Sequence, residues 1–128
     1  MLYSIKMKVA IPINNDRVAP RLPLAKEVCI IELQGKKEIG REKVNISLLH
    51  PMEIPDFLAS QGVTKVIAGG VNWHLQEILR VHNIDVIWGI MGAVDEVLEF
   101  YLKKGLRDGM GPCPPTRGRR RRFRGLYL

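Results

Sequence analysis

The sequence predicts one α/β domain with a mixed sheet that helices cover on both faces. Two β-branched runs lie close together near the start of the chain, and strand-like and helix-like segments alternate in the second half. Early neighbouring strands favour an antiparallel pair, whereas the later alternation favours parallel strands joined by helical crossovers. With 128 residues, of which 46% are hydrophobic and 26% charged, the chain suits a single core of ordinary globular composition.

The first predicted strand covers residues 8–13, an apolar run that ends in Asn14-Asn15-Asp16. Asparagine and aspartate favour turns, so we expect a loop over residues 14–23 after this strand. Pro12 argues against a central position in the sheet, because proline has no N–H to donate to a neighbouring strand.

Two further strands form a predicted hairpin. Residues 27–33 are a β-branched run, Gln34-Gly35-Lys36 can close a turn, and the chain returns over residues 37–46. Apolar and polar residues alternate imperfectly along the returning segment. This pattern indicates an edge strand with one face in water.

Helices and strands alternate from residue 55 onward. Pro55 and Gly62 bound a short helix, since proline suits a first helical turn and glycine suits a left-handed cap. A strand over residues 64–68 follows. The next helix begins after Asn72, which can cap it, and ends near Asn83.

The fifth predicted strand covers residues 84–88. A turn over residues 89–92 leads to an amphipathic helix that begins at Val94 and stops at Gly105. The sequence therefore predicts a five-stranded mixed sheet in a domain over residues 1–105.

Basic charge is concentrated after this domain. Residues 1–104 carry 13 basic and 12 acidic side chains, whereas residues 105–128 carry 7 basic side chains and 1 acidic one. We therefore expect residues 106–128 to be a disordered basic tail. Two interpretations are open, a solvated terminus or a segment that binds RNA or DNA phosphates through Arg119, Arg120, Arg121, Arg122 and Arg124.

Composition argues against several other protein classes. No apolar stretch approaches the roughly 18 residues that a membrane helix requires, so we expect no membrane partner. Lys6 and Lys8 interrupt the segment that an export signal would use. Two cysteines, Cys29 and Cys113, are too few for a disulfide framework. A cytoplasmic location is the expectation.

Glycines lie between a buried strand and a helix in two predicted turns, which contain Gly69-Gly70 and Gly89 with Gly92. Glycine lets main-chain N–H groups approach a ligand, and the start of a helix favours negative charge. An anion site is therefore one interpretation. The other is that the glycines only permit tight connections, and neither turn matches a nucleotide-binding fingerprint.

Three polar side chains would join these glycines at one edge of the sheet. If the first strand lies beside residues 64–68, the loop over residues 14–23 opens at the same edge, where a change of strand direction forms a crevice. Asn14 and Arg21 come from that loop, and Asn72 follows Gly69-Gly70. We expect all three side chains to contact the ligand.

Metal ligands are sparse in the sequence. His74 lies in the first turn of a predicted helix, where an imidazole can bind a metal, transfer a proton or be merely exposed. Cys113 lies between Pro112 and Pro114 and can bind a soft metal through its thiolate. Both residues are candidate metal ligands.

No catalytic constellation is found. The chain has no G-x-S-x-G elbow, and its serines lack a context that suggests activation by a base. Asp16, Asp85 and Asp95 could serve a metal-dependent nuclease only if they met, and each suits a turn, strand or helix-start role better. The sequence therefore predicts binding rather than catalysis.

Three segments together resemble the dinitrogenase iron–molybdenum cofactor biosynthesis family. They read MKVAIPI at residues 7–13 with Val18-Ala19-Pro20 after it, GVTKVIAGG at residues 62–70, and NIDVIWG at residues 83–89. The resemblance spans about residues 7–105. It implies a ribonuclease H-like three-layer α/β/α fold and a small binding or carrier domain for an iron–sulfur or iron–molybdenum type cofactor, with cofactor-assembly proteins as partners.

One position departs from the family pattern. Members typically carry a His-Phe-Gly-Arg type stretch after the proline, whereas this chain reads Arg21-Leu22-Pro23-Leu24. An arginine cannot replace a neutral imidazole as a metal ligand. Its guanidinium can instead hold an anionic cluster or an organic acid by charge-assisted hydrogen bonds.

Overall fold

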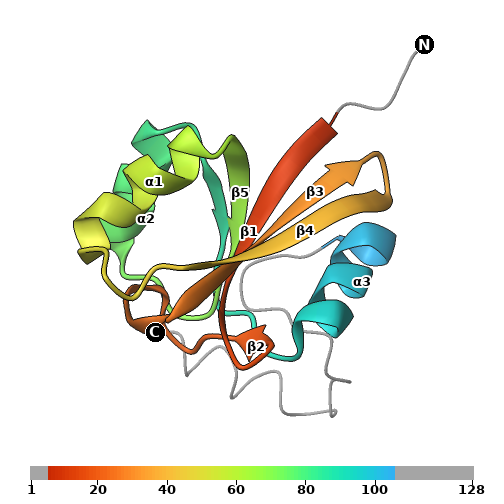
Figure 1. The fold of residues 1–128 in the computed structure, drawn as a ribbon, viewed down its shortest axis with the longest axis horizontal. Helices are drawn as coiled ribbons and strands as arrows, with labels where there is room; N and C mark the ends of the chain where they lie inside the picture. Colours follow the sequence, from red (N-terminus) through yellow and green to blue (C-terminus); the bar gives the residue numbers. More distant parts are fainter. Residues whose placement is uncertain (1–5, 106–128) are drawn as a thin grey trace.

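The structure, a computed structural model, describes residues 6–105. Its six-stranded mixed sheet has the order β4-β3-β1-β5-β6, and β2 pairs with β1 beside this path (Figure 1). β1 pairs antiparallel with β3 and parallel with β5, so strand direction changes at β1. The strands are β1 Lys6–Asn14, β2 Arg17–Val18, β3 Glu27–Gln34, β4 Lys37–Asn45, β5 Val63–Ile67 and β6 Asp85–Ile87.

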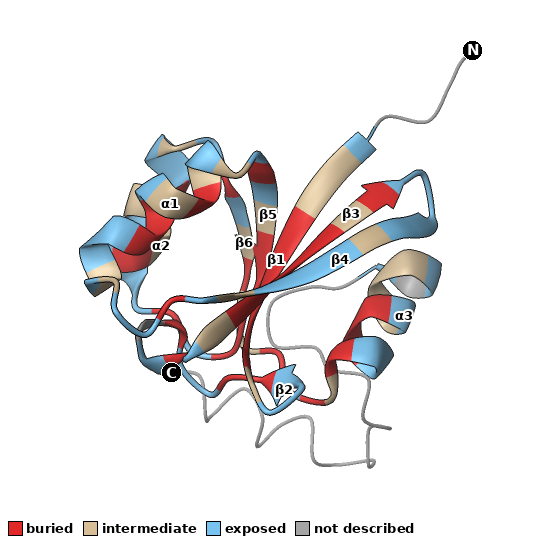
Figure 2. Cartoon of the chain, viewed as in Figure 1, coloured by how far each residue is buried: buried red, intermediate tan, exposed pale blue. Residues whose placement is uncertain are grey.

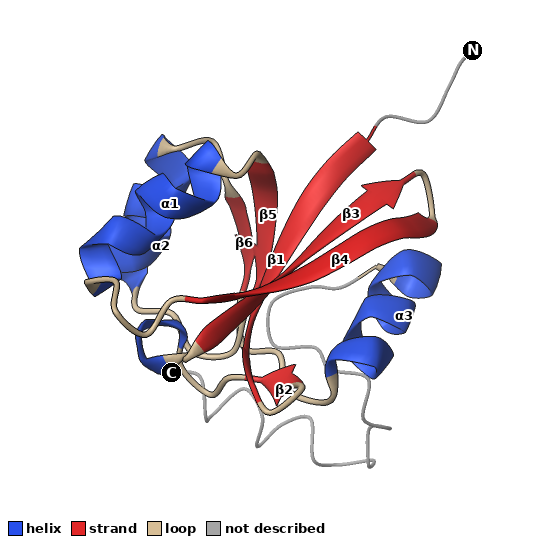
Figure 3. Ribbon diagram, in the orientation of Figure 1, coloured by secondary structure: helices blue, strands red, loops and turns tan. Residues whose placement is uncertain are grey.

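Helices cover both faces of the sheet, as the sequence predicts (Figure 3). On one face lie α1 (Ile54–Ser60) and α2 (Trp73–Val81), and on the other lies α3 (Val94–Lys104). Short 3-10 helices, Leu22–Leu24 and Pro51–Glu53, interrupt two of the loops. Among residues 6–105 no helix is long and apolar enough to cross a membrane.

The prediction of five strands missed β2. This strand is two residues long and lies inside the predicted loop over residues 14–23. Asn15 and Asp16 adopt left-handed backbone angles, with φ values of 54° and 66°, and fold the chain back onto β1. So short a strand has no hydrophobic alternation, and therefore sequence periodicity could not reveal it.

The expectation for Pro12 was wrong, because β1 is a central strand. The last parallel pair between β1 and β5 is Ala10 with Val66, so Pro12 lies beyond that ladder. Its carbonyl accepts a hydrogen bond from Ala19 N–H, at 2.8 Å, which shows that the proline's edge faces the β2 loop. The missing proline N–H therefore removes no bond to β3.

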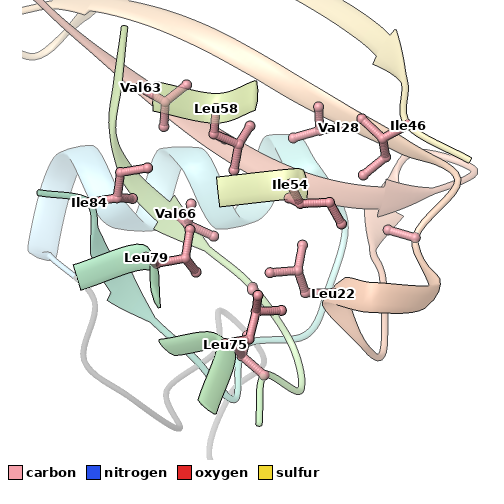
Figure 4. Packing of buried hydrophobic residues seen from close by; sticks show 14 of the residues in the cluster. Leu22, Val28, Ile46, Ile54, Leu58, Val63, Val66, Leu75, Leu79 and Ile84 are labelled. Carbon is pink, nitrogen blue, oxygen red and sulfur yellow. The ribbon is translucent and has the colours of Figure 1, made fainter. Parts of the chain in front are cut away.

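Two hydrophobic cores share the sheet, and burial follows the inner faces of the helices (Figure 2). Side chains of β1 alternate between them, with Ala10 facing α1 and α2 and with Val9 and Ile11 facing α3. Figure 4 shows the first core, where Leu58 of α1 and Leu79 of α2 are fully buried. Period-two alternation along a strand produces this division.

The two edges of the sheet are unsuited to pairing with another strand. β4 is an edge strand, as predicted, with mostly exposed residues and a register shift between Glu32 and Leu33 of its neighbour β3. β6, at the other edge, has only three residues. Charge, irregular pairing and short length are common protections for edge strands.

Candidate functional site at the carboxyl rim of the sheet

Three loops meet at one edge of the sheet, because β1, β5 and β6 are parallel and end there (Figure 1). We call these loops the carboxyl rim and define it as residues 14–26, 68–73 and 88–93. The strand direction changes at β1 beside this edge, and β1 pairs with β5, which is the condition that the sequence analysis set for a crevice here. Ligands of open α/β sheets commonly bind outside the carboxyl ends of strands at such a point.

Main-chain hydrogen bonds hold the three rim loops together. Gly70 N–H donates to the Pro20 carbonyl at 2.6 Å, and Leu22 N–H donates to the Gly70 carbonyl at 2.8 Å. Gly89 N–H donates to the Gly69 carbonyl at 2.7 Å. The third loop is tied to the first, because Val18 N–H donates to Gly92 carbonyl at 2.9 Å. Such cross-linked loops form a preorganised surface.

Close backbone approach explains the glycines after β5. A Cβ atom on Gly69 would lie 2.4 Å from the Ala19 carbonyl oxygen, and one on Gly70 would lie 2.9 Å from the Pro20 carbonyl oxygen. Both distances are too short for any side chain. Tight connection therefore explains both glycines without a ligand, as one of the two sequence interpretations held.

Backbone conformation explains the glycines after β6. Gly89 has a φ of 76° and Gly92 a φ of 130°, values that residues with a side chain rarely adopt. The N–H groups of Gly70 and Gly89 already donate within the chain. Within residues 6–105 the N–H groups of Gly69 and Gly92 have no acceptor, although both residues are largely buried. Main-chain N–H groups are almost always paired, so these two rim amides are free to donate to a ligand.

The three polar side chains expected at the rim differ in whether they already form hydrogen bonds within the chain. Asn14 Oδ1 accepts from Lys26 N–H at 3.2 Å, and Asn72 Oδ1 accepts from Leu75 N–H at 2.8 Å as the N-cap of α2. Arg21 is exposed, forms a parallel bridge with Gly70, and takes part in no ion pair with the described residues. By sheet register Arg21 lies beside Gly70, and Arg17, which bridges Ala93, lies beside Gly92.

The described residues do not fit direct ligation of a metal. His74 is exposed on α2, and its ring lies edge-on to the Trp73 ring with centroids 6.3 Å apart. No group of three His, Cys, Asp or Glu side chains that could hold an ion occurs within residues 6–105. Cys113 and the five tail arginines lie outside the described residues.

Cys29 is also unsuited to metal binding. It is 1% exposed in β3, and burial raises the pKa of its thiol. A thiol that stays protonated is a poor nucleophile and a poor ligand. Cys29 is therefore a residue of the hydrophobic core on the α3 side of the sheet.

The three aspartates considered for a nuclease site have separate roles. Asp16 pairs with Lys43 of β4, and Asp95, in the first turn of α3, accepts from Arg41 at 2.7 Å. The hydrogen bond to Asp16 raises the pKa of Lys43. Asp85 is exposed at the start of β6. Asp16 and Asp95 thus serve ion pairs, and Asp85 is an exposed strand residue.

A hollow of about 450 Å³ lies between α3 and the β3–β4 hairpin, away from the rim. Its charged side chains largely neutralise one another. Arg41 contacts Glu38 and Asp95, Lys103 contacts Glu99 at 2.8 Å, and the hydrogen bonds to Glu38 raise the pKa of Arg41. We regard the hollow as part of the salt-bridged contact between α3 and the β3–β4 hairpin.

Sequence reasoning missed three large apolar side chains on the rim. Leu24, Trp73 and Met91 are 70%, 72% and 52% exposed. A signal was available for Trp73, because it directly follows the capping Asn72, while the buried positions of the helix, Leu75 and Leu79, begin two residues later.

Comparisons with known proteins identify relatives over most of the chain. The family model described as dinitrogenase iron-molybdenum cofactor matches residues 6–104. The uncharacterized protein MJ0580 of Methanocaldococcus jannaschii is 22% identical over 102 residues, which are 76% of this chain and 86% of that protein.

Solved structures share the fold. The crystal structure of PH0822 has a TM-score of 0.75 at 21% identity and covers 80% of this chain and 94% of its own. The apo form of the orange protein from Desulfovibrio gigas has a TM-score of 0.67 at 19% identity and covers 88% and 100%. At these identities the likeness establishes architecture and leaves the ligand open.

Proposed function

Because the chain belongs to the dinitrogenase iron-molybdenum cofactor family, we propose that it is a small binding or carrier domain for an anionic cargo of the metal–sulfur type. The cargo binds at the carboxyl rim and is not chemically changed there. The family match over residues 6–104 is the observation that carries this proposal. The same membership favours a ribonuclease H-like class for the fold and cofactor-assembly proteins as partners.

The chemistry of the rim suits an anionic cluster that is bound through its outer sulfide or oxide ligands and not through direct bonds to its metal. The N–H groups of Gly69 and Gly92 and the guanidinium of Arg21 are hydrogen-bond donors. Donors bind the sulfide or oxide ligands of a cluster, whereas a bare metal ion needs acceptors. The Asn14 and Asn72 side chains shape the site, since their oxygens already accept main-chain hydrogen bonds. Metal ligation by His74 or Cys113 would add to these hydrogen bonds, and the proposal does not require it.

A binding measurement with tetrathiomolybdate, a molybdenum–sulfur dianion, tests this proposal. We expect Arg21→Gln to weaken binding in anaerobic equilibrium dialysis about tenfold, because a charge-assisted hydrogen bond is lost. The matched control is Lys36→Gln, which removes one positive charge from the β3–β4 turn and should leave the Kd within twofold. Equal losses in the two variants, or no binding by the parent chain, would contradict the proposal.

A further inference from the structure

Large apolar side chains project from each of the three rim loops. Leu24 is 70% exposed in the first loop, Trp73 is 72% exposed in the second, and Met91 is 52% exposed in the third. The loops are tied together by main-chain hydrogen bonds, so these side chains stand on one fixed edge. Exposed apolar residues that share a surface are typical of interaction sites.

The rim also carries an excess of positive charge. Its first loop contains the cations Arg17, Arg21 and Lys26, and all three are exposed. Within residues 6–105 none of them takes part in an ion pair. The only acid in these loops, Asp16, is paired with Lys43 outside the rim.

We propose that the carboxyl rim is also a docking surface for a partner protein whose contacting face carries acidic side chains around an apolar centre. Tryptophan, methionine and arginine are enriched in protein interfaces, and opposite charge speeds and orients docking. A second copy of this chain is a poor occupant, because two basic rims repel each other. The inference deepens the proposed function, since a partner docked here would meet the cargo.

Site-specific photo-crosslinking finds the partner. Trp73→benzoylphenylalanine in the full chain, expressed in cells of its source, should give a covalent adduct with one protein. Val81→benzoylphenylalanine is the matched control, because Val81 is 77% exposed at the other end of the same helix. No adduct above the Val81 control would overturn the proposal.

Binding of the captured protein, once purified, then tests the chemistry of the surface. We expect the double variant Arg17→Glu with Lys26→Glu to raise the Kd at least tenfold, and Trp73→Ser to do likewise. Lys36→Glu with Lys37→Glu makes the same charge change at the β3–β4 turn, at the opposite edge of the sheet, and should change the Kd less than twofold. Equal effects of the two double variants would overturn the proposal.

Two further outcomes are distinguished by the same variants. If phosphatidylserine vesicles sediment the full chain through Trp73 and the captured protein does not bind, the surface belongs to a membrane and the proposal is wrong. Arg21 is left unchanged because it belongs to the proposed cargo site. Trp73→Ser changes no charge at the rim, so tetrathiomolybdate binding that survives in this variant would show that a failed docking surface does not remove the proposed function.

Discussion

Gly69 shows how one residue position decides the shape of the rim. The carbonyl oxygens of Ala19 and Pro20 lie where a side chain at position 69 would begin, at 2.4 and 2.8 Å from the Cβ position. Both are backbone atoms of a loop that is itself hydrogen-bonded to β1 and to Gly70. The loop therefore cannot yield without losing main-chain hydrogen bonds.

We expect Gly69→Ala to lower the free energy of unfolding by about 2 to 3 kcal/mol, as other overpacked sites do. Gly40→Ala is the control, since its nearest neighbours would be 3.8 Å away, and it should change stability by less than about 0.5 kcal/mol. Urea unfolding of both variants gives the comparison. A Gly69→Ala variant as stable as Gly40→Ala would show that the loop does not pack as described.

Cys29 makes stability depend on pH in the alkaline range. Burial raises its pKa above the ordinary value of 9.0, so the folded thiol stays protonated while the thiol of the unfolded chain ionises. The unfolded state then binds fewer protons, and stability falls as the pH rises above about 9, by at most about 1.4 kcal/mol per pH unit. Below pH 9 the thiol adds no pH dependence.

Urea unfolding from pH 7 to pH 10.5 measures this effect. In a Cys113→Ser background, adding Cys29→Ala should remove part of the alkaline loss of stability. Identical pH profiles with and without Cys29 would refute the assignment. Slow alkylation of Cys29 in the folded chain at pH 8 is an independent check.

At the scale of elements, the N-cap residue Asn72 fixes where α2 begins. Asn72 has extended backbone angles, and its side-chain oxygen accepts from Leu75 N–H at 2.8 Å. Replacing such a cap by alanine typically costs about 1 kcal/mol. Asn72 therefore has a structural role at the rim whether or not it touches a ligand.

We expect Asn72→Ala to lose about 1 kcal/mol of stability in urea unfolding and Asn72→Asp to lose almost none, because aspartate caps equally well and suits the positive end of the helix. The pair separates capping from ligand contact. If Asn72→Asp were as unstable as Asn72→Ala, the capping role would be wrong.

Element prediction succeeded where local signals were strong. The helices after Pro55 and Asn72 and the edge strand over residues 37–45 lie close to the expected bounds, since proline, asparagine and exposed charge mark them locally. β2 and the central place of β1 were missed because both depend on tertiary contacts. Pro12 is tolerated only because the β2 loop, and no full strand, lies along its edge beyond Ala10.

At the scale of the whole molecule, the rim is made by three loops far apart in the sequence. The glycine pattern predicted which loops meet there, because parallel strands share an edge. The glycine pattern could not predict which N–H groups already donate within the chain. The hydrogen bonds from Gly70 to Pro20 and from Gly89 to Gly69 depend on how the loops pack against one another. The exposure of Trp73 and Met91 is likewise a property of the assembled rim.

Amide NMR of the full ¹⁵N-labelled chain during an anaerobic titration with tetrathiomolybdate tests the central claim most directly. We expect the N–H signals of Gly69 and Gly92 to shift with a common Kd, while those of Gly35 and Gly62, outside the rim, stay in place. Unmoved Gly69 and Gly92 signals, or shifts confined to residues 106–128, would contradict an anion site at the carboxyl rim.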